Sequence, residues 1–166
     1  MQPEELISVR EYRSTSYEPD RDYIDGVLEE RNKGETDHSY FQTAVASYFH
    51  ERRKKWGVCA LTEQRVQVSK TRFRVPDVCL VIGPKPDQPI ISTSPFVCIE
   101  ILSPEDRLSK VRERLNDYIR FGVPYVFLLD PETHKAYRWT TAGMTEVFEL
   151  RTENPDTLVP LEALFE

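Results

Sequence analysis

The strongest constraint on the fold is a nearly continuous apolar run, Phe-Val-Cys-Ile-Glu-Ile-Leu, at residues 96–102. Short runs of this composition are typical of strands that other elements cover on both faces of a sheet. One acidic residue, Glu100, interrupts the run. Because a buried carboxylate without a partner is costly, this residue predicts a cation, a metal ion or a group of hydrogen-bond donors beside it.

Apolar patterns on both sides of this run predict an alternation of helices and strands. One helical pattern runs from Thr36 to Gly57, and a second runs from Leu108, on the inward face, to Gly122. Strand and hairpin patterns occupy residues 21–30, 58–61, 63–69, 73–82, 125–129 and 136–150. This order of elements predicts an α/β fold with a mixed sheet.

The chain has 166 residues, the size of one domain, so we expect a single domain over residues 1–166 with a peripheral segment at residues 1–20. The longest wholly apolar run, residues 78–82, is too short for a membrane span, and the start lacks a signal-peptide pattern, which favours the cytoplasm. Three cysteines without CxxC spacing are expected to be free thiols. The net charge of −6 repels polyanions at long range, so any nucleic-acid contact must be local.

Two acidic residues interrupt apolar strand patterns at neighbouring places in the predicted sheet. Asp77 follows Pro76 within the expected strand 73–82, and Glu100 lies in the next long strand. Two carboxylates on adjacent strands can share one Mg²⁺ ion, which favours carboxylate oxygens and completes its shell with water and phosphate. The alternative is that each carboxylate lies at a strand end and is solvated, and the paired placement favours the shared site.

The combination of Pro76-Asp77, a spacer and Glu100 on a later strand resembles the PD-(D/E)XK restriction-endonuclease-like superfamily. Further motifs are similar to those of the Uma-type group of restriction endonucleases, which is abundant in bacterial genomes. These motifs are Asp25-Gly26 with Glu29-Glu30, His38, and residues 74–78, 100–107, 118–125 and 130–131. The resemblance extends from Tyr23 to Trp139.

The resemblance implies a restriction-endonuclease-like mixed central sheet flanked by helices, with additional N- and C-terminal strands. It also implies a Mg²⁺ or Mn²⁺ site and hydrolysis of phosphodiester bonds in DNA. By their positions in the motifs, Asp77 and Glu100 are the expected catalytic carboxylates and metal ligands, with the carbonyl of Ile101 as a further ligand. Divalent ions held there would polarise the scissile phosphate and lower the pKa of an attacking water.

The sequence departs from the superfamily motif at its lysine. That lysine would stand at Leu102, which carries no charge. In the Uma-type group the cation is thought to lie on the following helix, where Lys110 and Arg114 are both candidates on one face. Arg114 stands where relatives often have lysine, and an arginine can clamp phosphate but is a poor proton acceptor. Residues 103–106, Ser-Pro-Glu-Asp, suit the start of that helix, with serine as the N-cap and proline in the first turn.

Three further residues are weaker candidates for the site. His38 opens the first helix, where it is expected to touch phosphate or orient water, or else to be solvated. Glu30, at the end of the first hairpin, is a candidate extra acidic residue, and Gln42 lies one turn after His38. A basic cluster at residues 52–55 suits the C-terminal end of a helix and is also a candidate contact to a DNA backbone.

The leading hypothesis is a Mg²⁺- or Mn²⁺-dependent endonuclease that acts on DNA. One alternative is a catalytically inactive binding module that keeps the nuclease fold, which the acidic composition and Arg114 favour. The other is an interaction or dimerisation domain without an active site. Because cleavage of both strands of a duplex generally needs two active sites, the leading hypothesis also predicts a homodimer.

Overall fold

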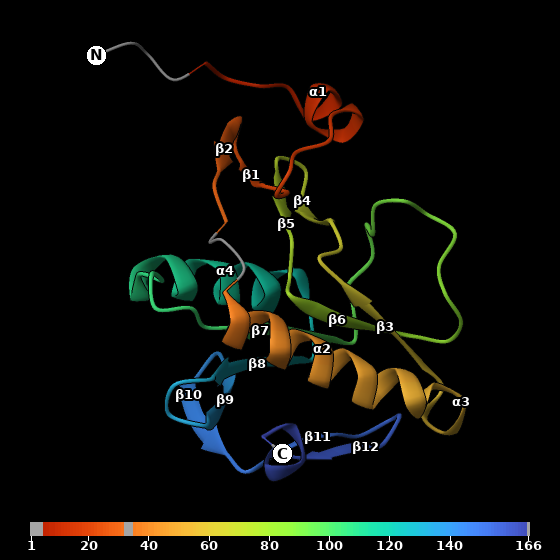
Figure 1. The fold of residues 1–166 in the computed structure, drawn as a ribbon. Coiled ribbons are helices and arrows are strands. Elements are labelled where there is room, and N and C mark those ends of the chain that lie inside the picture. Colours follow the sequence, from red (N-terminus) through yellow and green to blue (C-terminus); the bar gives the residue numbers. More distant parts are fainter. Residues whose placement is uncertain (1–4, 32–34, 166) are drawn as a thin grey trace.

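The structure is a computed structural model that describes residues 5–31 and 35–165 (Figure 1). Its elements in chain order are α1 (Val9–Ser14), β1 (Asp22–Ile24), β2 (Val27–Glu29), α2 (Thr36–Glu51), α3 (Arg53–Trp56), β3 (Val58–Thr62), β4 (Val66–Ser69), β5 (Arg72–Arg74), β6 (Val78–Ile82), β7 (Val97–Ile101), α4 (Leu108–Phe121), β8 (Tyr125–Asp130), β9 (Lys135–Thr140), β10 (Gly143–Val147), β11 (Glu149–Thr152), β12 (Thr157–Pro160) and the 3₁₀ helix η1 (Leu161–Leu164). This order of helices and strands confirms the predicted α/β class.

A six-stranded mixed sheet forms the centre of the fold, with the strand order β10-β9-β8-β7-β6-β3. The pair β7–β8 is parallel, and helix α4 connects these two strands. The other neighbouring pairs are antiparallel. A second sheet has the order β2-β1-β5-β4, in which β1 and β2 are the additional strands toward the N-terminus, and the hairpin β11–β12 supplies those toward the C-terminus.

Strand β7 corresponds to the apolar run and is buried along its whole length. Val97, Ile99 and Ile101 pack on the side of α2, whereas Cys98 packs on the side of α4. Because side chains alternate along a strand, Glu100 lies on the same face as Cys98. The two helices therefore cover opposite faces of the sheet, and the carboxylate in the run points toward α4.

The prediction of one strand over residues 73–82 is wrong, because this segment contributes to two sheets. Strand β5 pairs with β1 and β4, whereas β6 pairs with β3 and β7. Val75, Pro76 and Asp77 separate them, and a proline cannot continue a ladder because it has no amide hydrogen and a fixed φ. The break places Asp77 immediately before β6, where the chain passes from one sheet to the other.

The predicted Asp-Gly hairpin is confirmed as β1 and β2. Asp25 and Gly26 both have positive φ, 50° and 96°, as a tight hairpin turn with right-handed strand twist requires. Tyr23 of this hairpin packs against Phe73 and Tyr12. Tyr12 belongs to α1, within the segment expected to be peripheral, and it is fully buried.

The helical pattern predicted from Thr36 to Gly57 begins at Thr36 as expected, but it divides at Arg52 into α2 and the short α3, which Gly57 ends. Gly122 ends α4 with φ 96°, as predicted. The start predicted at Ser103-Pro104 is wrong, because the carboxylate of Asp106 accepts the Ser103 amide at 2.8 Å and closes a separate turn. Helix α4 begins only at Leu108, which is 57% exposed, so the prediction that this side chain faces inward is also wrong.

The sequence analysis also predicted free cysteines and no membrane-spanning segment. The three cysteines are free thiols, as predicted, and two of them lie in the core. Across residues 5–31 and 35–165, the chain forms no helix that is long and apolar enough to span a bilayer.

Candidate functional site

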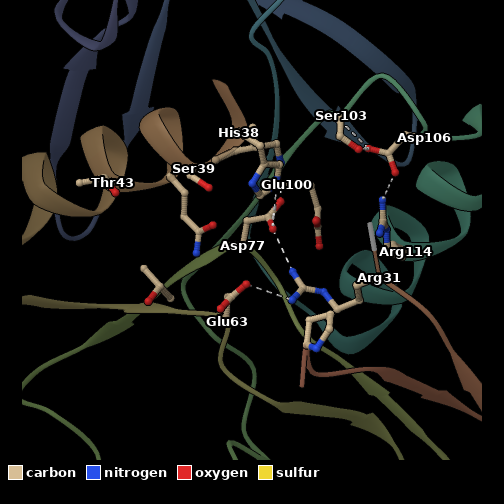
Figure 2. Close-up of a pocket in the computed structure, with 14 residues that line it drawn as sticks. Arg31, His38, Ser39, Thr43, Glu63, Asp77, Glu100, Ser103, Asp106 and Arg114 are labelled. Carbon is tan, nitrogen blue, oxygen red and sulfur yellow. Dashed lines mark hydrogen bonds and ion pairs between the residues drawn. The ribbon is translucent and has the colours of Figure 1, made fainter. Parts of the chain in front are cut away.

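A pocket of about 310 Å³ opens where β6 begins and β7 ends, beside the first turn of α2 (Figure 2). Its lining comprises Pro19, Arg31, His38, Ser39, Gln42, Thr43, Thr62, Glu63, Asp77, Glu100, Ile101, Ser103, Asp106 and Arg114. Six of these residues were predicted from the sequence, namely His38, Gln42, Asp77, Glu100, Ile101 and Arg114. Lys110 and Glu30 are outside this lining.

The two predicted carboxylates face each other across neighbouring strands. Val78 of β6 pairs with Ile99 of β7, and continuing this antiparallel register places Asp77 opposite Glu100. The amide of Ile101 donates a 2.7 Å hydrogen bond to Oδ2 of Asp77 and fixes this placement. Residues directly opposite in an antiparallel pair have adjacent side chains on one face, so the two carboxyl groups lie side by side.

Asp77 lies at the centre of a group of cationic donors. Its Oδ1 is 2.9 Å from Nη2 of Arg31 and 3.2 Å from Nε2 of His38. Burial raises the pKa of Asp77, but the hydrogen bond and charge of His38 and the charge of Arg31 outweigh it and lower that pKa. Burial lowers the pKa of His38, but the hydrogen bond to Asp77 and the negative charges of Asp77 and Glu100 together outweigh it and leave the pKa above its usual value. Asp77 is therefore ionised, and His38 is held toward its protonated form.

The pKa of Glu100 is shifted in the opposite direction to that of Asp77, although the two side chains are equally buried. Burial and the negative charge of Asp77 raise the pKa of Glu100 to about 8, while Arg114 and Arg31 lower it in part. The hydroxyl of Tyr118, on α4, donates a hydrogen bond to Oε1 of Glu100. The two neighbouring carboxyl groups are therefore shifted in opposite directions, Asp77 toward the ionised form and Glu100 toward the protonated form.

The structure separates the two candidate cations on α4. Arg114 lines the pocket, with its side chain 15% exposed and Nη2 3.3 Å from Oδ1 of Asp106. Nζ of Lys110 instead lies 3.9 Å from both Glu29 and Glu113, and its side chain is 54% exposed. Although the two residues are one helical turn apart, Lys110 is directed toward the smaller sheet rather than the carboxylates.

The two weaker acidic and amide candidates also differ in placement. Glu30 has a side chain 82% exposed and lies 3.8 Å from Arg21, away from the pocket lining. Gln42 lines the pocket one turn beyond His38, as its spacing on the helix predicted. The geometry thus joins Gln42 to the site and separates Glu30 from it.

Among the lining residues that the sequence analysis did not propose for the site, three carry charge: Arg31, Glu63 and Asp106. Arg31 follows the first hairpin in a run of charged residues, a pattern typical of solvated surface, yet its side chain is only 9% exposed. Glu63 lies 3.5 Å from Arg31 in the turn before β4. Asp106 was interpreted only as part of a helix start, and its contact with Arg114 depends on the turn that replaces that start.

The donor set fits a hard divalent ion that is completed by substrate and water. Asp77 and Glu100 supply neighbouring carboxylates, and Ile101, the last residue of β7, lines the same pocket. Within the described part of the chain, no group of three or more His, Cys, Asp or Glu side chains is arranged to hold a metal ion. Mg²⁺ commonly binds through only one or two carboxylates and keeps waters and phosphate oxygens as its other ligands.

A mixed sheet between two helices, with paired carboxylates at a break between strands, defines a protein of the nuclease-like α/β class. The chain belongs to the Uma2 family, described as "Putative restriction endonuclease", whose model matches residues 9–166. It is also similar to the crystal structure of a putative nuclease from Anabaena variabilis, with a TM-score of 0.79 and 21% identity over 96% of this chain and 97% of that chain. A comparison with curated proteins gave no match. The family and fold predicted from the sequence are thus confirmed.

Proposed function

We propose that this protein is a divalent-metal-dependent endonuclease that hydrolyses phosphodiester bonds in DNA, with Mg²⁺ or Mn²⁺ as its ion. The observation that carries the proposal is the convergence of Asp77 and Glu100 in one pocket that also contains buried arginines. Membership of a restriction endonuclease family supports a nucleic-acid substrate. The net charge of −6 means that binding must depend on local cations rather than on the overall field.

In the mechanism that we propose, Asp77, Glu100 and the Ile101 carbonyl would hold the ion. When bound, a divalent ion would supply positive charge there, polarising the phosphate and lowering the pKa of an attacking water. Arg114 contributes a guanidinium that neutralises charge as it builds on the phosphoryl oxygens. His38 holds Asp77 in place through its Nε2 hydrogen bond. Because both Arg114 and protonated His38 are donors, they bind and orient rather than accept a proton.

The first experiment incubates supercoiled plasmid with the protein and Mg²⁺ or Mn²⁺, with and without EDTA. We expect nicking that EDTA prevents and that Glu100→Ala abolishes. Calorimetric titration with Mn²⁺ separates the alternatives in the same preparation. A non-catalytic binding module would bind Mn²⁺ without nicking, and a domain without a site would do neither.

Arg114 and Lys110 make a matched pair of variants. We expect Arg114→Met to lower the nicking rate about 100-fold, because it removes the cation whose charge acts most strongly on Glu100. Lys110→Met is expected to have a far smaller effect, since its amine lies with Glu29 and Glu113 outside the pocket lining. Initial nicking rates at saturating Mn²⁺ measure both. A larger loss in Lys110→Met than in Arg114→Met would contradict this assignment.

Three further predictions remain proposals that concern the whole protein. We propose a homodimer, because two active sites are needed to cut both strands, and sedimentation equilibrium measures its mass directly. We also propose that residues 1–166 form one domain, for which a single unfolding transition is expected in urea. A cytoplasmic location is the third proposal.

A further inference from the structure

Arg31 is the buried cation of the pocket for which the mechanism above has no role. It lies outside the helices and strands, after β2, yet its side chain is 9% exposed. Figure 2 shows its guanidinium pointing into the pocket, toward Asp77 and Glu63.

The contacts of Arg31 occupy a carboxylate that the metal ion needs. Oδ1 of Asp77 accepts from Arg31 at 2.9 Å and from His38 at 3.2 Å. Oδ2 accepts from the backbone amide of Ile101 at 2.7 Å. These three donors take three of the roughly four lone-pair sites of the carboxylate, so an ion that binds Oδ1, or both oxygens, must displace one of them.

Of these three donors, Arg31 is the one most free to leave. The Ile101 amide is fixed in β7, and His38 is fixed in the first turn of α2. Arg31 extends from a segment without regular structure, on a side chain with several rotatable bonds. A divalent ion at Asp77 also repels the guanidinium, because two positive charges would then share one buried pocket.

We propose that Arg31 is a phosphate-binding residue that neutralises Asp77 in the metal-free protein and turns to the substrate phosphate once a divalent ion ligates Asp77. This inference rests on the proposed nuclease function. A guanidinium matches phosphate oxygens with two parallel N–H donors, as it does a carboxylate. Arg31 and Arg114 then hold the phosphodiester from two elements, the segment after the first hairpin and helix α4.

The test compares Arg31→Met with Arg31→Lys, which keeps the charge, and with Arg151→Met on the C-terminal hairpin, whose side chain is 61% exposed. Calorimetric titration with Mn²⁺ in the absence of DNA is the first measurement. We expect Arg31→Met to bind Mn²⁺ roughly tenfold more tightly than the wild type, because a competing cation is gone. Arg31→Lys and Arg151→Met are expected to stay close to the wild type.

The second measurement is binding of a short DNA duplex in Ca²⁺, which also takes carboxylate oxygens, over a range of salt concentrations. Arg31→Met is expected to reduce the salt slope of binding by about one, as the loss of one phosphate contact does. The nicking rate of Arg31→Met in Mn²⁺ is expected to fall about 100-fold, although this variant is expected to bind the metal more tightly. Opposite changes in metal affinity and nicking are not expected of a residue that only supports the fold.

The proposal is overturned if Arg31→Met binds Mn²⁺ no more tightly than the wild type, or if its salt slope is unchanged. In either case, nicking by the wild-type protein would still support the nuclease function. Failure of the Arg31 proposal is therefore distinguishable from failure of the proposed function. A wild-type protein that neither binds Mn²⁺ nor nicks DNA overturns both. Thermal unfolding checks each variant, and Arg31→Gln, which keeps an N–H donor for Asp77, replaces Arg31→Met if that variant does not fold.

Discussion

Replacing Asp77 with asparagine is expected to abolish Mn²⁺ binding and plasmid nicking and to destabilise the protein by about 3–5 kcal/mol. The change removes the charge that Arg31 and His38 share, so that two buried cations face a neutral amide. Calorimetry with Mn²⁺ and urea unfolding in EDTA measure the two effects. Asp87→Asn, in an exposed loop, is the matched control and is expected to match the wild type in both measurements.

The stability loss in Asp77→Asn has a defined pH dependence. Because the pKa of Asp77 is lowered in the folded protein, its contribution is complete above the ordinary carboxyl pKa and declines as pH falls through the folded value. The difference between wild type and variant is therefore expected to shrink in acid. A variant that still binds Mn²⁺, or that unfolds like the wild type at neutral pH, would contradict the role given to Asp77.

The convergence of the two carboxylates was predictable because strand patterns define it locally. Glu100 interrupts a run that only a doubly covered strand explains, and Asp77 follows a proline that ends one strand and precedes another. The assignment of residues 73–82 to a single strand was wrong, yet Asp77 still faces Glu100. Its position depends on the pairing of β6 with β7, which the apolar pattern after Asp77 does predict.

The cations of the site were harder to predict because their side chains are long and their surroundings are irregular. Arg31 follows a hairpin, and nothing in sequence spacing predicts that a charged loop residue turns inward. Lys110 and Arg114 share a helix face by spacing, and only the packing of α4 against both sheets shows which one reaches the pocket. The role of Asp106 depends on a turn that resembles a helix start in sequence.

Replacing Glu100 with glutamine is expected to lower the nicking rate about 100-fold or more. The same change is expected to make the metal-free protein more stable. Glutamine keeps an oxygen that accepts from the Tyr118 hydroxyl, so the packing is preserved. It removes a carboxyl whose pKa burial and Asp77 raise to about 8. The wild type therefore loses stability as pH rises from the ordinary carboxyl pKa toward 8, because the folded state retains a proton that the unfolded state releases.

The stabilisation by Glu100→Gln is expected to grow between pH 5 and pH 8, to reach a few kcal/mol, and to level off above that range. Urea unfolding in EDTA at several pH values measures it, with Glu105→Gln, an exposed neighbour in the following turn, as the control. Asp77→Asn and Glu100→Gln should thus have opposite effects on stability and the same effect on nicking. A less stable Glu100→Gln at pH 8 would mean that Glu100 is ionised in the free protein, and that the ion meets two charged carboxylates rather than one.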